Sequence, residues 1–181
     1  MPGKILNYVL FQAGWFACVL GGAHNMIALP IAAAGLIVGV RLWLAVPDDR
    51  LCDLRLYLAV GSIGFCLDSL HLSLGVFALI GTPRFPHLCP LWLVALWVMF
   101  GTTLRGSLSG LANRYGLAAL LGAVAGPLSY LSGARLGAVT LPPDRVFSLF
   151  ALAVGWAVVL PLLVWLAHGR CRTATPQGIG S

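Results

Sequence analysis

The stretch from Val146 to Ala167 reads VFSLFALAVGWAVVLPLLVWLA and contains no charged residue. A hydrocarbon core about 30 Å thick is crossed by a helix of roughly 20 apolar residues, so this stretch predicts a transmembrane helix. The rest of the chain is similar: of its 181 residues 60% are hydrophobic and 9% are charged, and the mean hydropathy is +0.95. Soluble domains carry roughly 25% charged residues, which excludes a soluble globular enzyme and a nucleic-acid-binding protein.

Five further apolar runs precede this stretch, and each is also long enough for a membrane helix. The connecting segments are short, which favours antiparallel neighbours and predicts an all-α fold: a compact bundle of six transmembrane helices. We expect a single transmembrane domain over residues 1–168 and a short polar cytoplasmic tail over residues 169–181. The six predicted spans are Leu6–Gly22, Met26–Ala45, Leu54–Ile80, Pro90–Ala112, Leu117–Val139 and Val146–Ala167.

Basic residues near the ends of the spans predict the orientation, because cytoplasmic loops of membrane proteins are enriched in Lys and Arg. With both chain ends inside, the cytoplasmic segments hold eight basic residues and the opposite side holds three. The distribution therefore predicts an N-in, C-in topology. The cytoplasmic set is Lys4, Arg41, Arg50, Arg55, Arg105, Arg114, Arg170 and Arg172, and the opposite set is Arg84, Arg135 and Arg145.

One acidic residue, Asp68, lies inside a predicted span. An ionisable group in hydrocarbon is costly unless it finds a partner or water, which makes Asp68 a functional candidate. His71 follows three residues later on the same helical face, and Gly61, Gly64 and Gly75 extend a small or polar stripe along it. Two interpretations are open: a proton-titrating or ligand-binding pair, and a packing contact that sets helix register.

The fourth span contributes Arg105 and Ser107 to the candidate site, and the fifth contributes Tyr130. Arg105 is offset from Asp68 by roughly two helical turns, about 10 Å. A long arginine side chain closes part of that gap, so an Asp68–Arg105 pair is one expectation, and an arginine that extends to the cytoplasmic interface is the other. The candidate intramembrane polar site comprises Asp68, His71, Arg105, Ser107 and Tyr130.

The fifth span contains small residues and a proline that indicate close packing and a kink. Gly122 and Gly126, like Gly133 and Gly137, have the spacing that lets two helices approach closely, and Pro127 removes a backbone donor. Kinked helices near the bilayer midplane form binding sites in transporters, and they also occur in bundles without a binding site.

Two of the six tryptophans, Trp97 and Trp156, lie deeper than an interfacial belt and are candidates to line a cavity for an acyl chain. Motifs of nucleotide and metal enzymes are missing: the sequence contains no P-loop, no dinucleotide glycine fingerprint and no HExxH helix. A Gly-x-Ser-x-Gly nucleophile elbow is also missing. We therefore expect no cofactor and no metal.

Four motifs distributed along the chain point to one bacterial family. They are NYVLFQAGW from Asn7 to Trp15, PLWLVALW from Pro90 to Trp97, TLRGS from Thr103 to Ser107 and GPLSYLSG from Gly126 to Gly133. The combination resembles an inner-membrane family catalogued as a domain of unknown function, the DUF2878-type family. The resemblance covers nearly the whole chain. It implies a multi-pass protein of the bacterial inner membrane in the context of membrane-lipid modification proteins, and it implies no catalytic or binding residue.

Three functions follow as hypotheses. The first is a protein that acts on membrane lipid or another apolar substrate within the bundle, as an accessory or as an enzyme. The second is a proton-coupled transporter of a small solute that uses Asp68 and His71. The third is a structural or assembly partner of a membrane complex, in which the polar stripe only sets helix register. In each hypothesis the lipid bilayer is a partner and nucleic acid is not.

Overall fold

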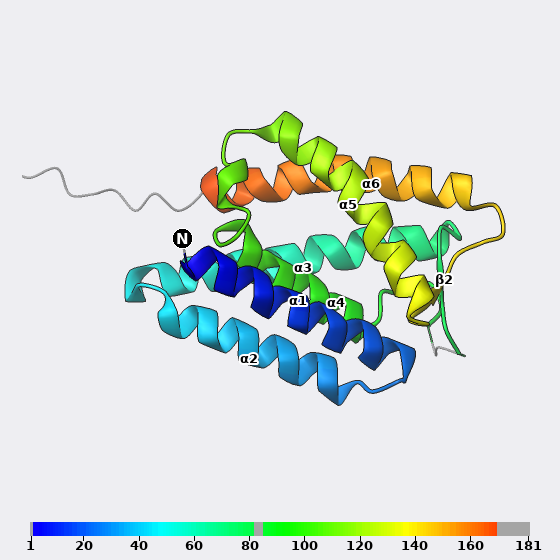
Figure 1. Cartoon of the computed structure of the whole chain (residues 1–181), viewed down its shortest axis with the longest axis horizontal. Helices are drawn as coiled ribbons and strands as arrows, with labels where there is room; N and C mark the ends of the chain where they lie inside the picture. Colours follow the sequence, from blue (N-terminus) through cyan, green and yellow to red (C-terminus); the bar gives the residue numbers. More distant parts are fainter. Residues whose placement is uncertain (1, 82–84, 170–181) are drawn as a thin grey trace, which may run out of the picture.

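The computed structural model describes residues 2–81 and 85–169. Within these residues it contains six α-helices and one two-stranded antiparallel ribbon (Figure 1). The helices are α1 (Pro2–Ala23), α2 (Ala28–Leu44), α3 (Arg50–Ser73), α4 (Leu91–Leu104), α5 (Tyr115–Arg135) and α6 (Arg145–Gly169). The strands are β1 (Ala78–Leu79) and β2 (Val139–Thr140), and the short 3-10 helices are η1 (Pro47–Asp49) and η2 (Ser109–Leu111). The predicted all-α fold is confirmed, whereas residues 170–181 of the predicted tail lie outside the described residues.

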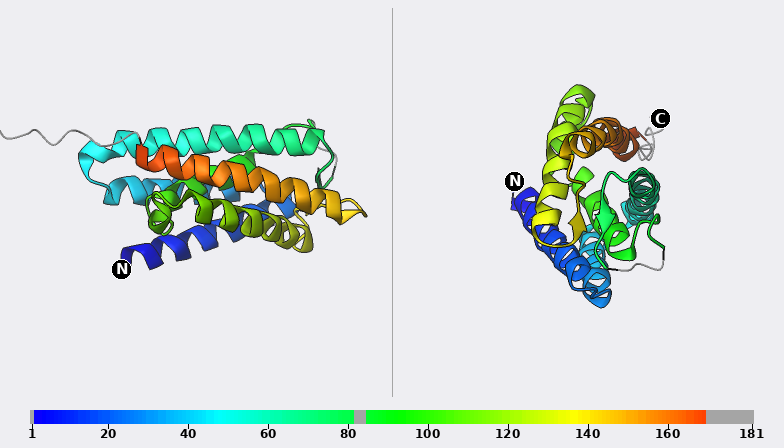
Figure 2. Two further views of the ribbon diagram at one scale, coloured as in Figure 1. Left: turned by 90° about the horizontal axis from the view of Figure 1, so that it is seen from above. Right: turned by 90° about the vertical axis from the view of Figure 1, so that its right-hand side faces the viewer.

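The helices form two groups. In the first group α4 is central, because it packs against α1, α2 and α3. In the second group α5 and α6 pack against each other, and α6 connects the pair to α3 and α4. Seen along the bundle, the α5–α6 pair lies beside the four-helix group, and α5 crosses the other helices obliquely (Figures 1 and 2). The side chains between the two groups therefore determine whether a cavity forms there.

Four helical segments are long and apolar enough to cross a membrane, namely Gly3–Ala23, Pro47–Ser73, Tyr115–Arg135 and Arg145–Gly169. The remaining two helices are shorter, with 17 residues in α2 and 14 in α4. At 1.5 Å per residue α4 is ~21 Å long, less than the hydrocarbon core of about 30 Å. The outer faces carry large apolar side chains, among them Leu36, Trp43, Val146 and Phe150, each at least 68% exposed. Such faces are typical of helices that contact lipid.

The third predicted span is longer than the helix found. The sequence predicts a helix that continues to Ile80, but α3 ends at Ser73 and Gly75 follows with a φ of +68°. Glycine adopts this left-handed conformation without strain because it has no Cβ. The chain then enters β1, where Ala78 pairs with Thr140 of β2. The segments after α3 and α5 thus form a small ribbon at one end of the bundle.

The fourth predicted span is also longer than its helix, since α4 ends at Leu104 and turns follow it. Backbone groups that are buried outside a regular helix need hydrogen-bond partners from the protein. Backbone carbonyls within the turns supply most of them, and Asn7 of α1, which is 1% exposed, supplies the partner of Ser107. Its Oδ1 accepts a hydrogen bond from the backbone N–H of Ser107 at 3.0 Å, and its Nδ2 donates to the carbonyl of Thr102 at 3.4 Å. A Cβ on Gly106 would overlap the Asn7 amide, so this close contact requires glycine.

Candidate functional site

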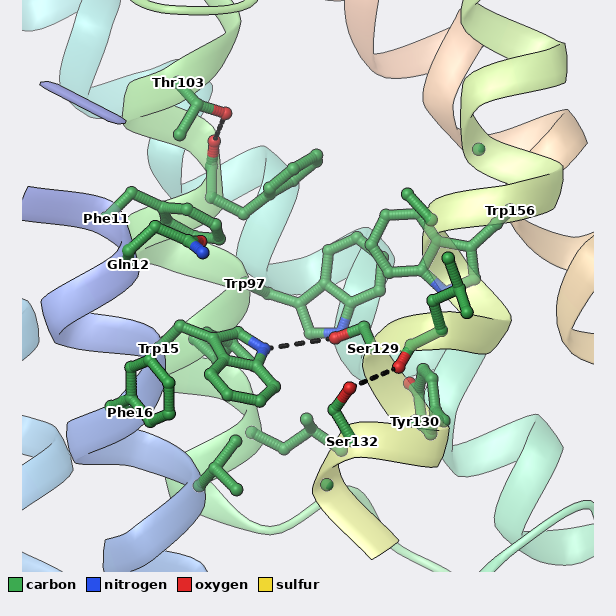
Figure 3. Close-up of a pocket in the computed structure, with 18 of the residues that line it drawn as sticks. Phe11, Gln12, Trp15, Phe16, Trp97, Thr103, Ser129, Tyr130, Ser132 and Trp156 are labelled. Carbon is green, nitrogen blue, oxygen red and sulfur yellow. Dashed lines mark hydrogen bonds between the residues drawn. The ribbon is translucent and has the colours of Figure 1, made fainter. Parts of the chain in front are cut away.

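An apolar cavity of about 830 Å³, called the groove from here on, lies between α1, α4, α5 and α6 (Figure 3). Nine aromatic side chains line it: Tyr8, Phe11, Trp15, Phe16, Trp92, Trp97, Phe100, Tyr130 and Trp156. The polar contributions are few and come from Gln12, Thr103, Ser107, Ser129, Ser132 and Arg135. Apolar walls with a small number of polar groups are the usual form of a ligand-binding cavity.

The groove opens between α1 and α5. Phe16 on α1 and Leu128 on α5 both line the groove, yet 49% and 55% of their surfaces are exposed, so they mark its mouth. A hydrogen bond crosses the mouth, in which Trp15 Nε1 donates to Ser129 Oγ at 3.1 Å (Figure 3). The two helices are thereby tied together without closing the space between them.

Two stacked indoles form the floor of the groove. The rings of Trp97 on α4 and Trp156 on α6 have centroids 4.7 Å apart and planes inclined by 13°, and Phe100 packs edge-on against both. Glycines on neighbouring helices leave room for these rings, since a Cβ on Gly64 would overlap Trp97 and a Cβ on Gly126 would overlap Trp156. Trp97 and Trp156 line a cavity as predicted, while an acyl chain as its occupant stays a prediction.

Asp68 of α3 lies behind this floor and is fully buried. Its Oδ2 accepts a hydrogen bond from Trp97 Nε1 at 2.6 Å, and its Oδ1 accepts one from the hydroxyl of Tyr130 on α5. Trp97 and Tyr130 both line the groove, whereas Asp68 is not among the described residues that do so. The carboxylate therefore orients two groove-lining side chains without contacting the space where a ligand would lie.

His71 lies one turn further along α3, with its Nδ1 3.8 Å from Asp68 Oδ1. This distance is too long for a hydrogen bond, and no described group pairs with Nδ1 although the side chain is only 4% exposed. The imidazole fits against α6 because position 155 is glycine, where a Cβ would lie 3.0 Å from the ring. The structure thus brings together three of the five candidate polar residues: Asp68, His71 and Tyr130.

Arg105 does not join this cluster, so the prediction of an Asp68–Arg105 pair is wrong. Because α4 ends at Leu104, Arg105 lies at the end of the helix and reaches the beginning of α3. Its Nη1 donates to Asp53 Oδ1 at 2.7 Å, and its Nε donates to the carbonyl of Ala167 on α6 at 2.8 Å. The side chain is 20% exposed and ties α3, α4 and α6 together, instead of extending freely to the interface.

Ser107 lines the groove in the turn between α4 and η2, apart from the Asp68 cluster. Sequence reasoning missed two residues that act here, Asn7 and Asp53. The signal for Asn7 is an amide inside an otherwise apolar run, where a polar group needs a partner. Asp53 directly precedes the third predicted span, where an acidic residue needs no special explanation, so no signal marks it.

The small residues of α5 have two different surroundings. Gly122 and Gly126 face α6, and a Cβ on Gly122 would overlap a backbone carbonyl of that helix. Pro127 follows inside α5, which continues through it. Gly133 and Gly137 form no second close helix contact: a Cβ on Gly133 would be 3.9 Å from its nearest neighbour, and Gly137 lies beyond the helix with a φ of +78°.

Cys89 connects the segment before α4 to α3 close to the Asp68 cluster. Its backbone N–H donates to Ser69 Oγ at 3.0 Å, and its side chain is 5% exposed. Burial raises the pKa of the Cys89 thiol, and the nearby Asp68 carboxylate adds to the increase. The thiol therefore stays protonated at neutral pH and acts as a packing group, because the thiolate is the nucleophilic form.

Comparison with known proteins gives one match. No curated protein and no solved structure matches the chain. A family model described as Protein of unknown function (DUF2878) matches residues 4–162, a range that includes parts of all six helices. This match confirms the resemblance drawn from the motifs, and the chain belongs to the DUF2878 family of proteins of unknown function.

Proposed function

We propose that the protein holds the hydrocarbon chain of a membrane lipid in the groove. In this proposal all six helices lie in the bacterial inner membrane, with both chain ends on the cytoplasmic side. The observation that carries it is the open mouth between α1 and α5. Both helices are long and apolar enough to cross a membrane, so a gap between them opens into lipid rather than into water. A ligand then enters sideways from the bilayer.

The length of the groove supports an extended chain as its occupant. The lining residues on α5 run from Leu121 to Arg135, which corresponds to ~21 Å along the helix at 1.5 Å per residue. One leaflet contributes about half of a core that is about 30 Å thick, so the groove accommodates the depth of a lipid chain. The stacked rings of Trp97 and Trp156 then form an apolar surface along which the chain lies.

Tyr130 supplies a polar contact in this apolar wall. Its hydroxyl donates to Asp68, which fixes its orientation and leaves its oxygen lone pairs able to accept a hydrogen bond from a ligand. A chain held beside an oriented hydroxyl fits a protein that acts on the lipid. It acts either as an enzyme or as an accessory that presents the lipid to a modifying enzyme, and a comparison of lipid composition between deletion and wild-type membranes tests that action.

Photo-crosslinking tests the occupancy of the groove. Purified protein is reconstituted with phosphatidylcholine that carries a diazirine in one acyl chain, and labelled peptides are identified by mass spectrometry after irradiation. We expect labels on the groove faces of α1 and α5. Ala125→Trp fills the groove and should reduce labelling several-fold, whereas Val124→Trp, on the adjacent exposed position outside the groove, should not. If all outer faces are labelled uniformly, and Ala125→Trp does not change the labelling, the proposal is refuted.

Proton-coupled transport of a small solute is the second candidate, and the buried pair of Asp68 and His71 is the observation that favours it. Neither residue is among those described as lining the groove, so the pair lacks contact with the space available to a ligand. If transport is the function, Asp68→Asn should abolish proton-coupled uptake in reconstituted vesicles. Uptake that persists in this variant excludes the role.

A further inference from the structure

The charge around the groove identifies the class of lipid, an inference that rests on the proposed function. Arg135 is the only one of the described lining residues with a charged side chain. It is the last residue of α5, and its side chain is exposed. Among the described residues, no carboxylate lies within ion-pair distance of its guanidinium. The groove therefore has a positive charge at one end and no compensating negative charge beside it.

The position of Arg135 matches the depth of lipid phosphates. Arg135 ends α5 shortly before β2, whose ribbon lies at one end of the bundle, so we place it near the membrane interface, where lipid headgroups carry their phosphates. A guanidinium binds phosphate through paired, charge-assisted hydrogen bonds, so the end of the groove is chemically suited to this group.

Two features surround the end of the groove at which Arg135 lies. A Cβ on Gly137 would lie 4.0 Å from the Cβ of Ala23, so α1 and the end of α5 meet there. Two turns back along α5, the Ser129 hydroxyl accepts a hydrogen bond from Trp15 and retains its own proton. No described group accepts that proton, which leaves it available for an acceptor such as an ester carbonyl.

We infer that the groove binds a phosphate-bearing glycerolipid, with the phosphate on Arg135 and an acyl chain along α5. The positive charge of Arg135 favours an anionic phosphate over a neutral glyceride and disfavours a cationic group at the same place. With both chain ends in the cytoplasm, the C-terminal end of α5 faces the opposite side. The bound headgroup therefore belongs to the outer leaflet of the membrane.

A comparison of the affinities for phosphatidic acid and for diacylglycerol with identical acyl chains measures the contribution of the phosphate. Purified protein in micelles should bind phosphatidic acid roughly tenfold more tightly than diacylglycerol. This factor is the contribution of one charge-assisted hydrogen bond at an exposed site. Arg135→Gln should abolish this preference, and Arg135→Lys should restore part of it. Arg145→Gln is the matched control, because it removes the same charge at the neighbouring start of α6, outside the groove.

Equal binding of the two lipids overturns the phosphate assignment alone, and so does a preference that survives Arg135→Gln. Displacement of phosphatidic acid by millimolar inorganic phosphate also overturns it, because the site would then recognise free phosphate without the chain. If neither lipid binds, and Ala125→Trp changes nothing, the proposed function fails together with this inference. An unchanged melting temperature of Arg135→Gln establishes that the variant is folded.

Discussion

Asp68→Ala and Asp68→Asn should differ in stability, because only asparagine keeps an acceptor at the centre of the buried cluster. Asp68 accepts hydrogen bonds from Trp97 Nε1 and from the Tyr130 hydroxyl, and all three side chains are buried. Asp68→Ala leaves both donors without an acceptor. Since an unsatisfied buried donor costs about 1–3 kcal/mol, the free energy of unfolding should fall by about 2–6 kcal/mol.

Asp68→Asn preserves the shape of the side chain and most of its hydrogen bonding. The amide oxygen still accepts from Trp97, and the amide nitrogen donates to the oxygen of Tyr130, which is able to accept as well as to donate. One hydrogen bond reverses its direction and none is lost, so we expect a cost of at most ~1.5 kcal/mol. The reversal also releases the Tyr130 proton toward the groove.

The assay is denaturant titration of protein in detergent micelles, followed by tryptophan fluorescence. Asp48→Ala and Asp48→Asn are the controls, because Asp48 is an exposed aspartate at the start of η1 and no described group bonds to its side chain. Both control variants should be close to neutral. Equal costs for Asp68→Ala and Asp68→Asn would refute the reasoning, since the retained acceptor would then make no difference.

Three further predictions concern packing, an ion pair and a thiol. Gly64→Ala should lower the melting temperature sharply because its Cβ would overlap an indole ring, whereas Gly35→Ala meets no atom within 4 Å and should stabilise α2 by about 0.5–1 kcal/mol. A double-mutant cycle of Arg105→Gln and Asp53→Asn should give a coupling of about 0.5–3 kcal/mol from their 2.7 Å pair, and zero coupling contradicts this. Cys89 should react slowly with maleimide at pH 7 and faster as the pH rises, because its raised pKa keeps the thiol protonated; fast labelling of the folded protein at pH 7, measured by mass spectrometry, contradicts this.

The number of helices was predictable because backbone in lipid must satisfy its own hydrogen bonds, so long apolar runs become helices. The bounds of α1, α2, α5 and α6 lie within four residues of the predicted spans. The end of α3 was not predictable in the same way. Val76 and Phe77 continue the apolar run, and the turn at Gly75 depends on pairing between β1 and β2, which come from distant parts of the sequence.

The site was predictable only in part. Asp68 stands out in the sequence because an acid in hydrocarbon needs a partner. Its partners Trp97 and Tyr130 come from two other helices, and which face each helix turns inward depends on close contacts such as those at Gly64 and Gly126. The rotation of each helix about its own axis is therefore not predictable from a single sequence. The partner of Arg105 was mispredicted for a related reason, since it depends on the residue at which α4 ends.

The contact between Asn7 and the end of α4 has a consequence for the order in which the chain folds. During synthesis the N-terminal segments emerge first, so α1 is available before the fourth apolar run leaves the ribosome. Without Asn7, the backbone N–H of Ser107 would lose the hydrogen-bond partner that α1 provides. The first helix is therefore formed before the turn that it later stabilises, and a chain that lacks α1 should hold the turn after α4 less firmly.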